Sequence, residues 1–350
     1  MKKDDNKKEE CHECAKPAKK WYKERLFIVS LIVAAILIIS YFIEFLSPLT
    51  LAFLDYLSLI WWALLLGFVL GGVIDHFIPN TYVRRYLTLH KKRTVLYSVV
   101  LGFLMSACSH GILAIAIELY RKGASTSSVI AFLLASPWAN IPITILLFGF
   151  FGLNAFYIVV SAIIIAIITG LIYQVLDRRG WIECKYCETK VDEKFSVRED
   201  AKRRIKNYKL TMKNLGNDLK GVMKGSWSLT KMVLWWIIIG MFMASFARAF
   251  IPHEWFMLYL GPTIIGLIVT LILATVIEVC SEGSAPLSFE IFKQTGAFGN
   301  SFVFLNAGVA TDYTELGLLW SNIGKRAAIL LPIITVPQIL LLGWMFNVFL

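Results

Sequence analysis

Long apolar stretches separated by short polar segments run through this chain of 350 residues. Many of them approach or reach the roughly 20 residues that an α-helix needs to cross a bilayer. Two of the apolar stretches, 94–120 and 262–292, carry small polar residues at their centres. The pattern predicts an all-α polytopic membrane protein. The other predicted spans are 26–45, 57–78, 128–151, 153–176, 229–250, 297–310 and 327–350.

The polar centres of the two interrupted stretches are related tetrapeptides. They are Cys108-Ser109-His110-Gly111 and Cys280-Ser281-Glu282-Gly283, which lie 172 positions apart. Other features recur at separations of 172 to 174, which indicates a duplicated transmembrane unit over 57–176 and 228–350. The recurring pairs are Trp61-Trp62 with Trp235-Trp236, Phe77-Ile78-Pro79 with Phe250-Ile251-Pro252, Tyr86-Leu87 with Tyr259-Leu260, Glu118 with Glu290, Gly123-Ala124 with Gly296-Ala297, and Asn140 with Asp312.

Three segments lie outside the duplicated unit. Residues 1–25 are predicted to be a charged cytoplasmic tail, 26–46 an added transmembrane anchor helix, and 177–227 a basic cytoplasmic loop. Apolar residues recur every three or four positions in the loop, which predicts an amphipathic helix that lies on the inner leaflet or packs against a partner protein. These residues are Ile205, Tyr208, Met212, Leu215, Leu219 and Val222.

Composition supports the membrane class. The chain is 57% hydrophobic and 17% charged, with a mean hydropathy of +0.67. Its net charge of +11 comes from Lys and Arg in the tail and loops between the spans. That distribution fits the positive-inside rule and an anionic lipid surface better than binding to nucleic acid.

The same rule predicts the path of the interrupted stretches. If 94–120 crossed the membrane fully, the basic loop 177–227 would lie opposite the basic tail. A hairpin that turns at the tetrapeptide keeps both segments inside, and the same path for 262–292 makes the two units run oppositely. We therefore expect two inverted-topology repeats whose re-entrant or broken helical hairpins meet near the bilayer midplane. A parallel repeat of kinked helices is the alternative.

The hairpin tips are the expected substrate site, because non-helical backbone at membrane depth requires burial in protein or contact with water. Glycine permits a tight turn, serine supplies a hydroxyl, and half-helix N-termini attract anions. Two interrupted spans, 136–142 and 306–312, are expected to pack against the tips, although an ordinary kink would also explain them. The candidate substrate-binding residues are Cys108, Ser109, Gly111, Cys280, Ser281, Gly283, Asn140 and Asn306.

Ionisable residues at the tips are candidates for proton coupling. His110 and Glu282 occupy matched positions in the two tetrapeptides, and Asp312 and Glu278 lie near them in the sequence pattern. Such groups are costly inside a membrane and are usually functional there. In the alternative interpretation, His110 and Glu282 pair with each other or cap helix ends, and so hold the tips together.

The remaining chemistry lies in six cysteines. Cys108 and Cys280 are expected to face each other as soft ligands for a thiophilic species such as trivalent arsenic, antimony or mercury. A buried cysteine can also be a small apolar side chain. The other four form two CxxC pairs in segments where thiols stay reduced, and could hold a structural zinc or pass on a metalloid, with His12 as a substitute ligand. These four are Cys11, Cys14, Cys184 and Cys187.

From Trp61 to the C-terminus the chain resembles the ArsP-type (YraQ-like) predicted permeases. The resemblance lies in the duplicated Cys-Ser-x-Gly tips, the two Gly-Ala junctions, and the stretches Phe132-Leu133-Leu134-Ala135-Ser136-Pro137 and Phe304-Leu305-Asn306-Ala307-Gly308. It implies export of methylarsenite-like or aromatic trivalent organoarsenicals from the cytoplasm. Two thiols suit this substrate, since an arsenic that already bears one carbon needs two sulfurs.

The sequence thus predicts a secondary active efflux permease in the plasma (cell inner) membrane, proton-coupled, with no enzymatic activity and no required cofactor. No P-loop is present to use ATP directly. The expected partners are the small-molecule substrate and membrane lipids, with a homodimer left open and no nucleic acid. The alternative functions are a carrier or channel that binds another small anion or metabolite through half-helix amides, a thiol-based redox protein, and a metal sensor.

Overall fold

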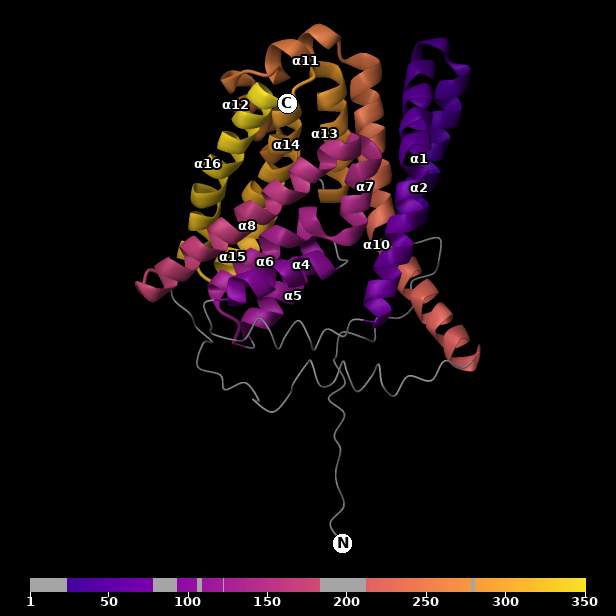
Figure 1. Ribbon diagram of the computed structural model, residues 1–350. Helices are drawn as coiled ribbons and strands as arrows, with labels where there is room; N and C mark the ends of the chain where they lie inside the picture. The colour runs from indigo at the N-terminus through magenta and orange to yellow at the C-terminus, as the bar shows by residue number, and fades with distance from the viewer. Residues whose placement is uncertain (1–23, 78–92, 106–108, 122, 183–211, 278–280) are drawn as a thin grey trace.

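The computed structural model describes residues 24–77, 93–105, 109–121, 123–182, 212–277 and 281–350 (Figure 1). Every regular element in these ranges is helical, so the predicted all-α architecture is confirmed. The helices are α1 (Arg25–Phe42), α2 (Ser47–Phe77), α4 (Thr94–Leu104), α5 (Ser109–Arg121), α6 (Thr126–Ala139), α7 (Ile141–Phe151), α8 (Ala155–Arg178), α10 (Met212–Phe250), α11 (His253–Leu260), α12 (Ile264–Ile277), α13 (Ser281–Thr295), α14 (Phe298–Thr311), α15 (Tyr313–Asn322) and α16 (Lys325–Phe349). Short 3-10 turns occupy Glu44–Leu46 and Gly152–Asn154.

The described residues contain five helical segments that are long and apolar enough to cross a membrane. The helices α11 and α12 pass the same test together, with a bend of 102° between them, and would make a sixth. The chain is therefore a multi-pass membrane protein. The five segments are Arg25–Phe42, Glu44–Ile74, Thr126–Arg178, Gly216–Phe250 and Lys325–Phe349.

The helix boundaries repeat with the separation seen in the sequence. Helix α6, shifted by 172 positions, has the bounds of α14, and shifted α4, α5, α7 and α8 match α12, α13, α15 and α16 to within two residues at each end. Helices α5 and α13 begin at the two tetrapeptides, and we call them the tip helices. Equivalent glycines follow them, Gly123 with φ 93° and Gly296 with φ 66°. Only glycine adopts such angles readily, so the same chain reversal is encoded twice.

Equivalent helices point in opposite directions in Figure 1. Helix α2 ends low in the view and α10 begins there, while α8 ends low and α16 ends high, at the C-terminus. Helices α2 and α10 pack along each other, and α8 contacts α16, where Tyr173 donates a hydrogen bond to the Ala327 carbonyl at 2.6 Å. These directions favour the inverted relation, and the position of the repeats across a membrane stays a prediction.

Helix α10 is longer than the sequence pattern indicated. Residues 212–227, expected to belong to a separate amphipathic helix, form its first turns, so the predicted boundary at 227 falls inside a continuous helix of 39 residues. This part packs on the end of α2, where Asp218 contacts His76 at 3.0 Å. A Cβ on Gly72 would meet the Ser226 side chain, so the two helices approach closely there. Leu219, from the predicted apolar stripe of this segment, is nevertheless 61% exposed, so α2 does not cover the stripe at that position.

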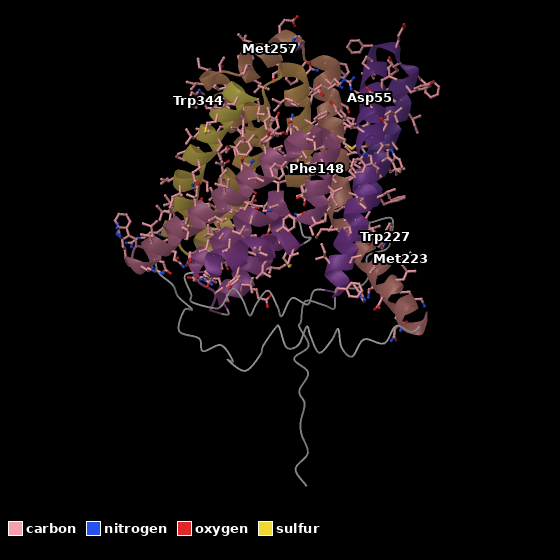
Figure 2. The ribbon with its side chains drawn as sticks, in the orientation of Figure 1. Asp55, Phe148, Met223, Trp227, Met257 and Trp344 are labelled. Carbon is pink, nitrogen blue, oxygen red and sulfur yellow. The ribbon has the colours of Figure 1, made fainter. Side chains whose placement is uncertain are left out.

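Aromatic and basic side chains mark the two ends of the bundle. Trp227 on α10 and Trp344 on α16 lie at opposite ends and are both exposed (Figure 2). Tryptophan favours the two membrane–water interfaces. The lower end of Figure 1 carries the basic residues of the α5 and α8 C-termini and the α10 and α16 N-termini. Among them are Arg121, Arg178, Arg179, Lys220, Lys224, Lys325 and Arg326.

Candidate transport site

A small cavity lies between α2 and α7 of the first repeat and α10 and α13 of the second. We call it the inter-repeat cavity. Its volume is about 20 Å³, which is room for about one water molecule. The walls are apolar except for Asn140 and Glu282, two residues that the sequence pattern had singled out. The lining comes from α2 (Ala63, Leu64, Gly67, Phe68), the α6–α7 break and α7 (Asn140, Pro142, Ile143, Leu146), α10 (Leu229, Val233, Ile237) and α13 (Glu282).

Asn140 forms the break between α6 and α7. Its Oδ1 accepts a hydrogen bond from the Ile143 amide at 2.9 Å, and its Nδ2 donates to the Ser136 carbonyl at 2.8 Å. The side chain therefore caps α7 and satisfies a carbonyl at the end of α6. Pro142 favours this break because proline is tolerated in the first turn of a helix.

Asp312 makes the equivalent break between α14 and α15. Its carboxylate accepts hydrogen bonds from the Thr314 amide at 2.7 Å and from the Thr314 hydroxyl at 2.8 Å. Asn306, one and a half turns earlier, donates to the Phe302 carbonyl at 3.0 Å. Asn306 and Asp312 are both buried. The second break is thus held by a helix cap, as the first one is.

The tip helices contact the broken spans of the opposite repeat. Helix α13 packs against α7, and α5 packs against α15. These two contacts are equivalent under the 172-residue repeat. The first contact contains the inter-repeat cavity, with Glu282 from the first turn of α13 and Asn140 from the α7 cap.

The first turn of α13 is fixed closely against α10. A Cβ on Gly240 would lie 1.9 Å from the Gly283 carbonyl oxygen, so the two backbones touch where both residues lack side chains. Glu282 is 4% exposed and Ser284 is 6% exposed. This part of the second tip is therefore surrounded by protein.

Comparison with known proteins identifies the family of this chain. Residues 44–348 match the family model ArsP_1, described as a predicted permease. The chain belongs to this family. It is 26% identical over 274 residues to the UPF0718 protein YcgR of Bacillus subtilis, covering 77% of this chain and 86% of that protein. It is 24% identical over 273 residues to a Streptococcus mutans protein named as a candidate subunit of a two-component membrane permease complex, covering 76% and 84%.

No solved structure matches the chain. Family membership and the membrane-spanning helices make the protein a membrane transporter rather than an enzyme. The family match includes both repeats, and begins after α1, the helix that the sequence pattern treats as an added anchor.

Several predicted site residues of the permease lie outside the described residues. These are Cys108, Cys280 and Glu278, together with the CxxC cysteines Cys11, Cys14, Cys184 and Cys187. The backbones of Ser109, His110, Gly111 and Ser281 are described at the starts of α5 and α13, but their side-chain surroundings are not. In the described part of the chain, no group of three or more His, Cys, Asp or Glu residues could hold a metal ion. The thiol site stays a prediction.

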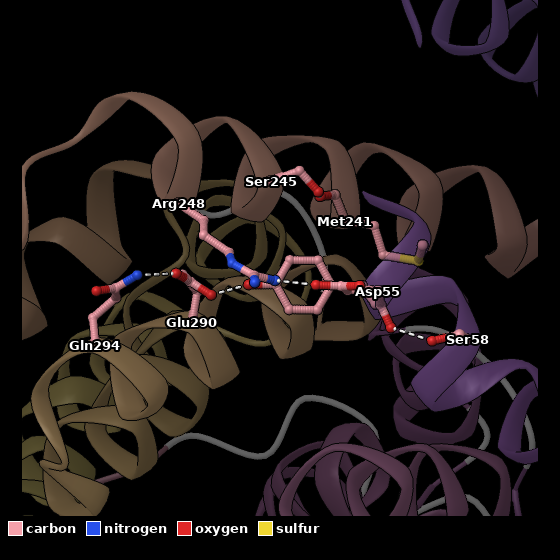
Figure 3. A network of polar contacts seen from close by, with 8 residues as sticks. Asp55, Ser58, Met241, Ser245, Arg248, Glu290 and Gln294 are labelled. Carbon is pink, nitrogen blue, oxygen red and sulfur yellow. Dashed lines mark hydrogen bonds and ion pairs between the residues drawn. The ribbon is translucent and has the colours of Figure 1, made fainter. Parts of the chain in front are cut away.

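Sequence reasoning missed a buried polar network in the permease (Figure 3). Glu290 on α13 is fully buried and accepts hydrogen bonds from the Tyr56 hydroxyl of α2 and from Gln294 Nε2, the latter at 2.6 Å. Arg248 on α10 forms an ion pair with Asp55 at 3.0 Å beside it. A signal was present, since Glu290 is the repeat counterpart of Glu118 and lies in an apolar stretch. Nothing in the sequence places Tyr56 against it.

Proposed function

We propose that this permease is a secondary active exporter of trivalent organoarsenicals of the methylarsenite type, or of related thiophilic metalloids. The observation that supports a transport path between the repeats is the inter-repeat cavity. There, the cap of one broken span and the first turn of the opposite tip helix supply the polar wall residues, Asn140 and Glu282. Ionisable and amide groups in an otherwise apolar membrane interior are typical of substrate pathways.

The orientation in the membrane is part of the proposal. The basic helix ends gather at the lower end of Figure 1, and the positive-inside rule assigns that end to the cytoplasm. The tail and the 177–227 loop would then also be cytoplasmic. In this arrangement the two repeats have inverted topology, and the substrate moves from the lower end to the α11 end.

In the proposed mechanism the thiolates of Cys108 and Cys280 bind the arsenic from opposite tips. Ser109, Ser281, Asn140 and Asn306 would supply hydrogen bonds, and Gly111 and Gly283 would allow the backbone to approach. A cavity of about 20 Å³ is too small for a methylated arsenical. Transport therefore requires the tip helices to move relative to α2 and α10, which alternating access by one repeat against the other would supply.

Proton coupling is proposed as the driving reaction. His110, Glu278, Glu282 and Asp312 are the candidates near the tips, and Glu282 reaches the cavity wall. The CxxC pairs are proposed as a structural zinc site or as a transient metalloid site on the cytoplasmic side. The Streptococcus relative also raises assembly with a second subunit as a proposal, next to a homodimer.

The second candidate is a carrier for another small anion or metabolite. The observation that favours this carrier is that α5 and α13 both begin at the tips. The N-terminus of such a half-helix can bind an anion through its backbone amides. In that case the tip cysteines would be small apolar side chains, and serine would replace them without loss.

The deciding experiment is growth of an arsenic-sensitive host that expresses the chain, with methylarsenite, arsenite, antimonite and mercuric ion tested in parallel. A Cys108→Ser/Cys280→Ser double variant at matched membrane expression is the control. We expect resistance to methylarsenite in the wild type and its loss in the double variant. Absence of resistance to all four compounds would refute the metalloid substrate and leave the anion carrier. Resistance retained by the double variant would refute thiolate binding at the tips.

A further inference from the structure

Glu290 occupies an unusual position in α13. Its exposed fraction is 0%, and both carboxylate oxygens accept hydrogen bonds: Oε2 from the Tyr56 hydroxyl and Oε1 from Gln294 Nε2 (Figure 3). Tyr56 is 1% exposed, so the contact between α2 and α13 is also closed to bulk water. An ionised carboxylate accepts hydrogen bonds only, and these two donors match that form.

Two cations lie near the ring of Tyr56. The Arg248 guanidinium is 5.8 Å from the centre of the tyrosine ring, and the Lys293 ammonium is 6.0 Å from it. Arg248 also pairs with Asp55, whose side chain is 60% exposed. These charges help to offset the cost of a buried carboxylate. Glu290 can therefore be ionised in the closed arrangement.

The ionisable groups around Glu290 can be named helix by helix. Asp55 and Tyr56 come from α2, Arg248 from α10, and Lys293 from α13 itself, while α11 carries His253 and Glu254. The other neighbours, α6, α7 and α14, contain no ionisable residue. Glu290 is the single carboxylic acid among these groups that is fully buried. The Glu290 carboxylate is therefore stabilised by the hydrogen-bond donors Tyr56 and Gln294 rather than by bulk water.

Exposed surface lies one residue away from Glu290 on the α11 side. Gln294, which donates to Glu290, also accepts a hydrogen bond at Oε1 from Nδ1 of the exposed His253 of α11, at 3.2 Å. A small opening of α11 would therefore bring water to the carboxyl. In the proposed orientation this end of the bundle faces away from the cytoplasm, which is the side from which protons drive export.

The Glu290–Tyr56 contact joins the helices that close the inter-repeat cavity. Glu282 lies on the same helix as Glu290, eight residues earlier, or about 12 Å along the axis at 1.5 Å per residue. Tyr56 lies on α2, two turns before the cavity residue Ala63. A shift of α13 away from α2 as a rigid helix would therefore widen the cavity and break this contact.

We propose that Glu290 takes up the coupled proton of the permease and that its protonation releases α13 from α2. The proton enters from the α11 end and binds the carboxylate, which loses its charge. One oxygen then becomes a donor, so the Tyr56 hydroxyl can no longer donate to it, and the attraction between the carboxylate and the nearby cations is lost. Release of α13 lets the cavity open, and the proton leaves to the opposite side before the contact forms again. This inference rests on the proposed function for proton coupling, for the orientation in the membrane and for the identity of the driven substrate.

The chain supplies a matched control in the repeat counterpart. Glu118 occupies the equivalent position on α5, but it is exposed. Glu118→Gln and Glu290→Gln therefore make the same chemical change at equivalent positions, and only the second removes a buried carboxyl. Tyr56→Phe keeps the carboxyl and removes one of its donors.

The first test needs no substrate. Infrared difference spectra of the full-length protein in lipid vesicles, recorded between acidic and neutral pH, detect the carbonyl band of a protonated carboxyl. We expect a band that Glu290→Gln abolishes and Glu118→Gln retains, and whose titration midpoint shifts in Tyr56→Phe. A band that persists in Glu290→Gln, or a midpoint unchanged by Tyr56→Phe, overturns the proposal even if Glu290→Gln folds poorly, because Tyr56→Phe is an independent variant.

The second test uses methylarsenite in the same vesicles. We expect Glu290→Gln to keep exchange of labelled for unlabelled methylarsenite and to lose accumulation driven by a pH gradient at least tenfold, while Glu118→Gln keeps both. Gradient-driven accumulation by Glu290→Gln would refute the assignment. If the wild type moves no methylarsenite, the proposed substrate fails and the infrared result still decides the role of Glu290.

Discussion

At the scale of single residues, Asp312 tests whether a buried polar group acts in transport or in folding. Its carboxylate accepts from the amide and the hydroxyl of Thr314, which is the work of a helix cap. Asparagine can also cap a helix, whereas alanine cannot, at a cost of about 1 kcal/mol. If Asp312 acts as a cap and not as one of the candidate proton carriers, Asp312→Asn keeps stability and gradient-driven transport, and Asp312→Ala unfolds more readily. Unfolding in mild detergent and vesicle transport measure the two effects, and loss of proton coupling in Asp312→Asn would instead assign Asp312 to the proton path.

Asn140 is the counterpart of Asp312 in the first repeat, and its contacts give a second prediction. Asn140 uses Oδ1 as a cap for α7 and Nδ2 as a donor to Ser136, and it also lines the inter-repeat cavity. Asn140→Asp keeps the cap but turns a carboxylate oxygen towards the Ser136 carbonyl, so we expect lower stability and weaker transport. Asn140→Ala loses both the cap and the donor, and we expect a loss of about 1 kcal/mol from the missing cap alone. Equal transport by the aspartate variant and the wild type would show that the donor at the cavity has no role in transport.

At the scale of helices, the close approach of α10 and α13 gives a sharper prediction. A methyl group at Gly240 would collide with the Gly283 carbonyl, whereas one at Gly216, on the same helix, would meet nothing within 4 Å. We expect Gly240→Ala to displace the tip helix and to lower stability by about 1–3 kcal/mol, as overpacking does. Gly216→Ala is expected to be neutral or stabilising by up to about 1 kcal/mol, since alanine favours helix. Thermal unfolding and transport of the two variants check this, and equal behaviour would contradict the contact.

Asn300 is one of the side chains that hold the bend between α11 and α12. Buried Asn300 donates to the Leu260 and Gly261 carbonyls and to the Thr270 hydroxyl at 3.0 to 3.1 Å, and accepts from Asn347 at 2.7 Å. Asn300→Ala leaves these groups without their partner, at a cost of about 1–3 kcal/mol. Asn300→Asp adds a carboxylate that faces two carbonyls, so we expect it to be less stable than the alanine variant. The reverse order in an unfolding measurement would contradict the hydrogen-bond assignment.

At the scale of the whole molecule, local sequence signals predicted more than long-range packing did. The polar interruptions at 136–142 and 306–312 located both span breaks, and the repeat separation of 172 predicted equivalent helices. The continuity of α10 through residue 227 could not be read locally, because residues 218–226 pack on the end of α2. The burial of Glu290 likewise depends on Tyr56, 234 positions away. The tip cysteines stay predictions, and so does the arrangement of the repeats across the membrane.

That arrangement can be tested at equivalent chain positions. Arg178, at the end of α8, corresponds to Leu350 after α16, and both the neighbouring Arg179 and Leu350 are exposed. Inverted repeats place these ends on opposite sides of the membrane, and parallel repeats place them on the same side. We expect Leu350→Cys and Glu254→Cys, each in a cysteine-free chain, to react with an impermeant thiol reagent in intact cells, and Arg179→Cys to react only after permeabilisation. Labelling of positions 179 and 350 from the same side would exclude the inverted repeat, and with it the paired movement of the tips on which alternating access depends.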